Sequence, residues 1–249
     1  MEYILEANNI EKKYGHFKAL NNLSMHIPKG AIYGLIGKNG AGKTTLIRLL
    51  CGLQRVTSGE YTIYGISNNS RKIAEARKRI GGIIETPSIC SDMTAVDNLK
   101  EQYKIIGLPS YSKLDEILKL VGLDNTGKKT AKHFSLGMKQ RLGIAISLVG
   151  NPDLLILDEP INGLDPEGII EIRELILTLN REKGITFLIS SHYLDELSKI
   201  ATCYGIIDKG RIIKEIDKDE LEQNFKIRTQ INVTNLKECV KYLEEENLH

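Results

Sequence analysis

One glycine-rich segment constrains this chain of 249 residues more than any other feature. Residues 37–44 read Gly-Lys-Asn-Gly-Ala-Gly-Lys-Thr and fit the pattern Gly-x4-Gly-Lys-Thr. The apolar run 31–36 before the segment predicts a buried strand, and the run 45–50 after it predicts a helix. A glycine-rich turn between a strand and a helix presents backbone N–H groups and the positive end of the helix to an anion. The segment therefore predicts a phosphate-binding loop rather than an ordinary turn.

The side chains of this loop have separate expected roles. We expect the Lys43 ammonium to reach the β- and γ-phosphates of a nucleotide and the Thr44 hydroxyl to ligate Mg²⁺. The rest of the loop would contribute mainly backbone N–H groups. Its residues are Gly37, Lys38, Asn39, Gly40, Ala41, Gly42 and Thr45.

A second apolar run ends in two carboxylates. Residues 154–160 read Leu-Leu-Ile-Leu-Asp-Glu-Pro, which is typical of a strand buried on both faces in a parallel sheet. The acidic pair would then lie at the carboxyl edge, where open α/β sheets bind ligands. Asp158 suits the coordination shell of Mg²⁺, and Glu159 suits a general base for the attacking water. An acid pair that merely closes a strand at the surface is the alternative, and the phosphate loop favours the first interpretation.

A third motif carries a family resemblance. Residues 134–142 read Phe-Ser-Leu-Gly-Met-Lys-Gln-Arg-Leu and open the apolar helix 143–149. Local physics predicts only a helix start, with Ser135 as N-cap and a small residue at Gly137. Together with the acidic strand end that follows, the motif resembles the signature of ATP-binding cassette (ABC) ATPases. The resemblance covers residues 2 to about 218 and implies that the chain binds and hydrolyses ATP.

The resemblance implies roles for further residues. Tyr14 resembles the aromatic side chain that stacks on adenine, and His192 resembles the switch histidine that contacts the γ-phosphate. Catalysis would use His192 together with Lys43 and Glu159. The signature segment, expected to contact ATP held by a partner cassette, is Ser135, Leu136, Gly137, Met138 and Lys139. The loop expected to cross to that partner is Asn162, Gly163, Leu164 and Asp165.

One position departs from the family pattern. The family usually carries a glutamine that ligates Mg²⁺ and senses the membrane partner, but here the strand 80–84 ends in Glu85. No glutamine lies between Gln54 and Gln102, so a shifted alignment does not explain the difference. A carboxylate still suits a hard cation, and the expected Mg²⁺ ligands are Thr44, Glu85 and Asp158. Glutamate at this position, with this form of the signature, resembles the ATP-binding subunits of bacitracin-resistance and lantibiotic-immunity exporters.

The order of these motifs predicts an α/β fold with a P-loop NTPase core. We expect a mostly parallel sheet, an N-terminal antiparallel β-subdomain and a helical signature subdomain at about 87–150. The expected strands are 3–10, 20–27, 59–65, 80–84, 153–158, 185–190 and a hairpin at 205–213, and the expected helices are 71–79, 95–106, 113–121 and 166–180. The ATP-binding domain would span 1–220. A short extension over 221–249 would hold a strand at 226–233 and an amphipathic helix at 235–246, which either dock on the main body or lead into further chain.

Composition narrows the partners and the location. A net charge of +2 gives little support for nucleic-acid binding. No apolar stretch approaches the ~20 residues that span a bilayer, and the N-terminus lacks a secretory signal. The four cysteines have no metal or disulfide spacing and would be free thiols; they are Cys51, Cys90, Cys203 and Cys239. We expect a cytoplasmic protein, peripheral on the inner face of the cell membrane.

The resemblance implies the ATP-hydrolysing subunit of a membrane ABC transporter. Two copies, or paired cassettes, would enclose ATP, and a membrane-embedded permease would be the other partner. Glu85 and the signature favour export of an antimicrobial peptide of the lantibiotic or bacitracin type. Three alternatives stay open: an exporter of a drug or lipid, an ABC ATPase without a membrane partner that acts on DNA or ribosomes, and a nucleotide-binding regulator without turnover.

Overall fold

The computed structural model of the chain describes residues 2–224. The chain divides into two compact units, Met1–Lys218 and Asp219–His249. Of the second unit, the structure describes the helix α8 (Lys218–Asn224), which begins at the last residue of the first. The strand and helix expected at 226–233 and 235–246 lie outside the described residues. The motifs that predict nucleotide binding all belong to the first unit.

A six-stranded sheet forms the core of this unit, in the order β10-β9-β3-β8-β7-β6. Neighbouring strands run parallel, except for β9 and β10. The strands are β3 (Ile32–Ile36), β6 (Ile80–Ile83), β7 (Leu154–Asp158), β8 (Thr186–Ser191), β9 (Cys203–Asp208) and β10 (Arg211–Asp217). Every residue of β7 and β8 is buried, so the expectation that a continuous apolar run is covered on both faces is confirmed.

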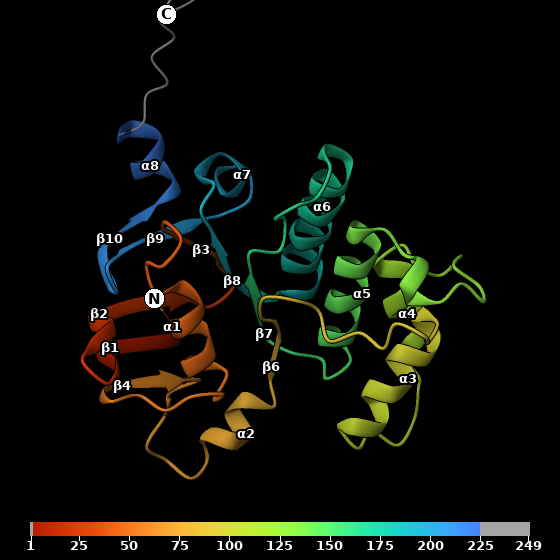
Figure 1. Cartoon of the computed structure of the whole chain (residues 1–249), viewed down its shortest axis with the longest axis horizontal. Coiled ribbons are helices and arrows are strands. Elements are labelled where there is room, and N and C mark those ends of the chain that lie inside the picture. Colours follow the sequence, from red (N-terminus) through yellow and green to blue (C-terminus); the bar gives the residue numbers. More distant parts are fainter. Residues whose placement is uncertain (1, 225–249) are drawn as a thin grey trace, which may run out of the picture. The chain divides into compact units, whose positions relative to one another are not determined.

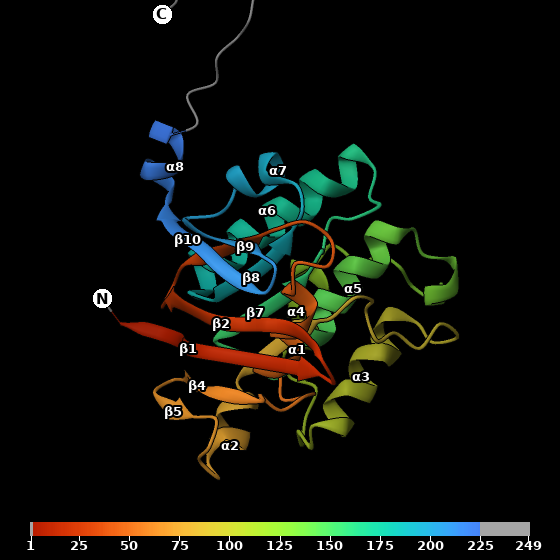
Figure 2. The ribbon, with the colours of Figure 1, turned by 60° about the vertical axis from the view of Figure 1, so that its left-hand side comes forward.

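A second, antiparallel sheet is formed by strands from the N-terminal part of the chain, in the order β2-β1-β4-β5. Its strands are β1 (Tyr3–Tyr14), β2 (Phe17–Pro28), β4 (Ser58–Ile63) and β5 (Ile66–Ser67). The connection between β1 and β2 is shorter than predicted, because only residues 15–16 separate the two strands. The first predicted strand ends before β1 does, and the second begins after β2 does, because the hairpin end is mostly exposed and carries no alternating apolar pattern. Figure 2 shows this sheet as a layer beside β8, β9 and β10.

The helices either cover the sheets or form a separate group. Helix α1 (Lys43–Leu50) buries four apolar side chains in a core shared by strands of both sheets. Figure 1 shows α3 (Ala95–Ile105), α4 (Leu114–Leu120) and α5 (Leu136–Leu148) gathered on the side away from β1 and β2. The other helices are α2 (Ile73–Arg77), a 3₁₀ turn (Ala131–His133), α6 (Pro166–Lys183) and α7 (Leu194–Ser198).

These elements confirm the expected fold class, with its mostly parallel core, antiparallel N-terminal sheet and helical part. Helix α7 was not predicted, because its five residues are too few to show a helical period in the sequence. Within residues 2–224, no helix has both the length and the apolar character that a bilayer crossing requires.

A polar cluster fastens the antiparallel sheet to the core sheet. The Glu215 carboxylate on β10 accepts hydrogen bonds from the Tyr33 hydroxyl at 2.7 Å and from the His26 backbone N–H at 2.8 Å. The His26 ring contacts the same carboxylate, with Nδ1 at 2.9 Å from Oε2. Because a Cβ at Gly205 would lie 2.8 Å from the Tyr33 Cζ, a glycine there leaves room for the buried tyrosine ring. One side chain on each of β2, β3 and β10 thereby joins the two sheets.

We predict that Gly205→Ala destabilises the fold by about 1–3 kcal/mol, because the added methyl group would push the Tyr33 ring from its bond to Glu215. The matched control is Gly150→Ala, where the nearest atoms would lie 3.8 Å from the new Cβ. The control should change stability by no more than about 0.5 kcal/mol. Urea unfolding of the full chain measures both. Equal midpoints for the two variants would show that Tyr33 has room to move.

Candidate nucleotide-binding site

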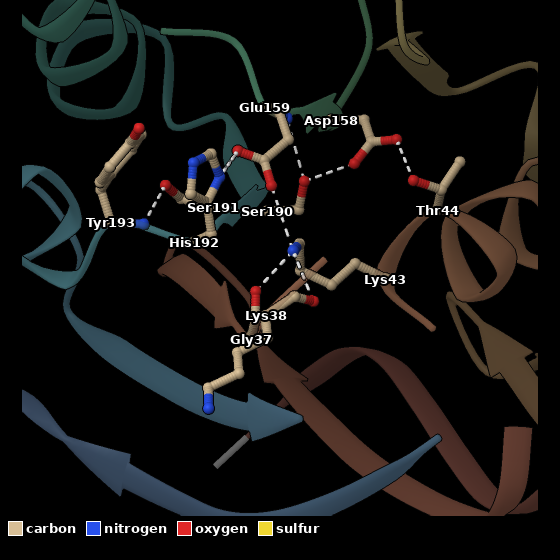
Figure 3. A network of polar contacts seen from close by, with 10 residues as sticks. All are labelled: Gly37, Lys38, Lys43, Thr44, Asp158, Glu159, Ser190, Ser191, His192 and Tyr193. Atoms are coloured by element: carbon tan, nitrogen blue, oxygen red, sulfur yellow. Dashed lines mark hydrogen bonds and ion pairs between the residues drawn. The ribbon is translucent and has the colours of Figure 1, made fainter. Parts of the chain in front are cut away.

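The phosphate loop connects β3 to α1 and closes around its own lysine. The Lys43 ammonium donates to the carbonyl oxygen of Gly37 at 2.6 Å and to that of Lys38 at 3.3 Å. Only 6% of the Lys43 side chain is exposed. Figure 3 shows the ammonium between these carbonyls and the carboxylate of Glu159, which follows β7. The loop therefore brings its positive charge to the carboxyl edge of the core sheet.

Two glycines of the loop are required by its geometry. At Gly37, a Cβ would lie 2.6 Å from the Ile207 Cγ2, because the loop passes directly against β9. Gly42, the residue before α1, has φ 110°, which disfavours other residues. The helix therefore begins immediately after a turn that only glycine makes without strain, and its first N–H groups are available to an anion.

The Asp158 carboxylate is buried and bound from two sides. The Thr44 hydroxyl of α1 donates to Oδ2 at 2.8 Å, and the Ser190 hydroxyl of β8 donates to Oδ1. Asp158 is 2% exposed, which overturns the alternative of a surface acid pair closing a strand. A buried carboxylate is stable only with such partners. The oxygens of Thr44 and Asp158 suit Mg²⁺, a hard cation, and these two residues would hold it.

Glu159 lies between a lysine and a histidine. Its Oε1 is 3.1 Å from the Lys43 Nζ, and its Oε2 is 2.8 Å from the His192 Nδ1. The backbone of Glu159 has φ 51°, and its N–H donates to the Ser190 carbonyl and hydroxyl oxygens at 3.2 and 2.9 Å. An ionised carboxylate only accepts, so Nδ1 carries the proton in the contact with His192, and Nε2 is left for another partner. Figure 3 shows the three side chains converging.

This arrangement brings together all three predicted catalytic residues. Lys43, Glu159 and His192 form one contact chain, and Thr44 and Asp158 form a second next to it. A carboxylate fixed between two cationic or proton-donating groups is in a position to orient a water molecule near bound phosphates. The chemistry that the geometry allows is hydrolysis of a phosphate ester or anhydride.

Glu85 does not join this group. Its Oε1 is 2.6 Å from the Arg48 Nη2, and 59% of its side chain is exposed. Among residues 2–224, no three His, Cys, Asp or Glu side chains gather closely enough to hold a metal ion. Of the expected Mg²⁺ ligands Thr44, Glu85 and Asp158, the structure brings Thr44 and Asp158 into contact and pairs Glu85 with Arg48, and the set itself stays a prediction.

Phe17, an aromatic residue with no role predicted from the sequence, lines a cavity at the phosphate loop. A cavity of about 320 Å³ beside the loop is lined by Phe17, Ala19, Glu159 and the loop residues 38–45 except Ala41. The predicted adenine-stacking residue, Tyr14, lies at the other side of the β1–β2 turn. The Tyr14 hydroxyl donates to the Gln54 Oε1, and the Lys12 ammonium lies 5.1 Å from the centre of its ring. The structure thus adds Phe17, which was not predicted, as a ring available to a base.

The signature opens α5, away from the loop cavity. The Ser135 hydroxyl accepts a hydrogen bond from the Met138 N–H at 3.2 Å, which confirms the predicted N-cap. Leu136 is 51% exposed. The crossing loop lies next to the signature, because a Cβ at Gly163 would be 3.4 Å from a Leu136 methyl carbon. None of the five signature residues lines the cavity at the phosphate loop.

Ser190 is another residue at this site that was not predicted from the sequence. It donates to Asp158 and accepts from Glu159, so it positions both acids. A signal was present: Ser190 ends an apolar run, and parallel pairing sets it opposite Asp158. The contact of Ser190 with Asp158 depends on the register between β7 and β8, which local sequence patterns do not determine.

A cysteine close to the site is not a candidate nucleophile. Cys51 follows α1, and burial raises its thiol pKa to about 12, with a smaller contribution from the Asp158 charge. Burial likewise raises the pKa of Cys203 to about 11. Since the thiolate is the reactive form, both stay protonated near neutral pH.

Comparison with known proteins gives consistent matches. A model described as "ABC transporter" matches residues 20–162. The bacitracin transport ATP-binding protein BcrA of Enterococcus faecalis is 42% identical over 98% of this chain and 79% of its own length. The lantibiotic transport ATP-binding protein SrtF of Streptococcus pyogenes is 48% identical over 89% of this chain and 96% of its own.

Solved structures agree with these matches. An ATP-binding cassette of an ABC transporter in its ADP conformation, MJ1267, has a TM-score of 0.79 and 28% identity, covering 90% of this chain and 94% of its own. A bacterial ABC transporter cassette solved as a dimer, MJ0796, has a TM-score of 0.75 and 25% identity, covering 86% and 98%.

We predict that Tyr14→Ala and Phe17→Ala each weaken ATP binding but leave binding of inorganic tripolyphosphate unchanged. A lost base stack of about 1–3 kcal/mol corresponds to roughly 5- to 150-fold in affinity. Tyr14→Phe, which keeps the ring and removes the bond to Gln54, is the control and should bind ATP normally. Isothermal calorimetry measures the affinity of each variant for both ligands. A variant that binds ATP like the unmutated chain would remove its residue from the base site.

Removing the Ser190 hydroxyl should destabilise the buried acid. We predict that Ser190→Ala lowers the free energy of unfolding by about 1–3 kcal/mol, because Asp158 and the Glu159 N–H each lose a partner. Ser190→Thr keeps the hydroxyl and should recover most of the loss. Urea unfolding provides the measurement, and an unchanged midpoint for Ser190→Ala would contradict this role.

Proposed function

Because this chain belongs to the ABC transporter family, as an ATP-binding subunit that hydrolyses ATP, we propose that it powers the export of an antimicrobial peptide. The observation that carries the ATPase part is the contact of Lys43, Glu159 and His192 at the carboxyl edge of the core sheet. The peptide part is supported by the relatives, one of which is a bacitracin and the other a lantibiotic transport protein.

The proposed reaction uses the side chains in distinct roles. Lys43 and the N–H groups at the start of α1 bind the β- and γ-phosphates. Glu159 orients the attacking water, while its contact with the His192 Nδ1 leaves the Nε2 free to contact the γ-phosphate. Thr44 and Asp158 would hold Mg²⁺, which would supply positive charge to neutralise the phosphates. Catalysis is therefore mainly positioning and charge stabilisation.

A second copy of the chain completes the proposed site. A Cβ at Gly137 would meet nothing in its own chain closer than 3.8 Å, so nothing inside the described chain requires a glycine there. A requirement from outside, such as phosphates bound to another copy, supports the assignment of Ser135 and Gly137 to a partner's ATP. A relative cassette has been solved as a dimer. ATP binding would close such a dimer, and hydrolysis would open it, because the two states differ in affinity for the nucleotide.

A permease in the membrane is the proposed second partner. A groove of about 360 Å³ opens beside β6 and is bounded by Leu53, Glu85, Thr86 and Ile146, among others. Its mixed apolar and polar lining suits a short amphipathic segment of another protein. The cassette would then work at the inner face of the cell membrane, where the permease meets the ATP supply. Export of a drug or lipid is the second candidate for the cargo.

The catalytic assignment has a direct test. We predict that Glu159→Gln lowers the ATPase rate by about 10²- to 10⁴-fold, because the amide cannot act as a base. The variant should accumulate as a dimer with ATP and Mg²⁺, since ATP is held without turnover. Size-exclusion chromatography and a phosphate-release assay measure the two effects.

The control for this variant is Glu75→Gln, which removes an exposed carboxylate on α2. It should keep the parental rate and the parental elution volume. A Glu159→Gln protein that hydrolyses ATP at the parental rate would overturn the assignment of this carboxylate.

The cargo is tested with the permease in place. The cassette, isolated from its native membrane with its bound permease, should hydrolyse ATP faster when bacitracin or a lantibiotic is added. Cells that carry Glu159→Gln should also become more susceptible to the same peptide. A complex that responds to an unrelated drug or lipid, and to neither peptide class, would replace the proposed cargo while leaving the ATPase assignment intact.

A further inference from the structure

The backbone at Glu85 is held in an unusual turn. Glu85 follows β6 by two residues and has φ 63°, in the left-handed region that non-glycine residues seldom occupy. The Thr86 N–H donates to the Ile84 carbonyl oxygen at 2.8 Å, so the three residues form a γ-turn centred on Glu85. Strained residues of this kind persist where surrounding contacts fix them. A contact of the Glu85 side chain is one means of fixing this turn.

Arg48 supplies the anchor from the helix of the phosphate loop. Its Nη2 lies 2.6 Å from the Glu85 Oε1, within the range of a charge-assisted hydrogen bond. Arg48 is four residues after Thr44 in α1, so both side chains lie on the same helix face, one turn apart. The ion pair thus connects the helix that begins at the phosphates to the turn after β6.

The same contact conflicts with Glu85 as a metal ligand. The guanidinium stays charged at all physiological pH values, so a cation bound to Glu85 would have to displace it or lie beside it against repulsion. Thr44 and Asp158 already offer oxygens in mutual contact, 2.8 Å apart.

We propose that Glu85 is not a Mg²⁺ ligand in this chain but the anchor of the Arg48–Glu85 ion pair, in which Arg48 is the positioning residue for the loop 84–88. That loop lines the groove beside β6, and Arg48 lines it as well. A displacement of α1 on nucleotide binding would then reach the groove through this pair. The inference rests on the ATP-binding function and is independent of which molecule is exported.

The first experiment measures the Mg²⁺ requirement. Binding of a fluorescent ATP analogue to the full chain is followed as Mg²⁺ is titrated, for Glu85→Gln, Arg48→Met and Asp158→Asn. Asp158→Asn should raise the half-saturating Mg²⁺ concentration by about 10- to 100-fold. The other two variants should stay within about twofold of the unmutated chain. A shift for Glu85→Gln as large as that for Asp158→Asn, with none for Arg48→Met, would make Glu85 a metal ligand and overturn the proposal.

The second experiment measures the connection between helix and groove. Hydrogen exchange of the peptide that covers residues 84–88 is recorded with and without the ATP analogue. The analogue should protect this peptide in the unmutated chain and in Arg48→Lys. It should fail to do so in Arg48→Met and Glu85→Gln, and protection should return in the charge-swapped double variant Arg48→Glu/Glu85→Arg. Equal protection in all variants would show that the pair transmits nothing.

A matched ion pair controls for the loss of a surface charge. Arg79 and Asp153 lie 2.6 Å apart, with half-exposed side chains like those of the proposed pair. Asp153→Asn should change neither the Mg²⁺ requirement nor the exchange of residues 84–88. If it changes both as Glu85→Gln does, the effect is general and the proposal fails. Absence of ATP-analogue binding by the unmutated chain would instead contradict the ATP-binding function.

Discussion

The site depends on one buried charge, the carboxylate of Asp158. An ionised group that is 2% exposed is stable only if hydrogen-bond donors replace the water it has lost. Here the donors are hydroxyls from α1 and β8, so the charge holds the phosphate-loop helix and two core strands in fixed relation. The apolar residues of β7 and β8 keep water from this edge, and that exclusion strengthens each polar contact there.

The fold places opposite charges at this edge through separate routes. Lys43 is the first residue of α1, whereas Glu159 follows β7 with a left-handed backbone. Ser190 holds the Glu159 N–H, and the parallel register of β7 with β8 makes that contact possible. Because each catalytic side chain is fixed by a neighbour on a different element, loss of one neighbour alters the geometry of the others. This is the arrangement that catalysis by positioning requires.

The sequence predicts the parts of this molecule that have local causes. Apolar runs predict β7 and β8, and the glycine-rich spacing predicts the phosphate loop, because strand burial and tight turns restrict residue type directly. Contacts between distant segments have no such signal. Ser190, Arg48 and Phe17 are ordinary residues in their local contexts: the sheet register brings Ser190 to Asp158, the position of α1 brings Arg48 to Glu85, and the β1–β2 hairpin brings Phe17 to the loop cavity. The exposed end of the β1–β2 hairpin escaped prediction for the opposite reason, since no burial constrains it.

The charge of the side chain at position 85 determines whether it pairs preferentially with arginine or is available to a metal ion. A neutral amide at this position would have no electrostatic preference for the Arg48 guanidinium over a metal ion. A carboxylate prefers the guanidinium, and here one charge-assisted contact joins the Arg48 Nη2 to the Glu85 Oε1. Under the proposal, the paired carboxylate would offer no net negative charge to Mg²⁺, and the oxygens of Asp158 and Thr44 would be the ones that bind the metal ion. Where an arginine occupies the facing turn of α1, we therefore expect a glutamate in place of the glutamine to connect α1 to the loop after β6 and not to ligate Mg²⁺.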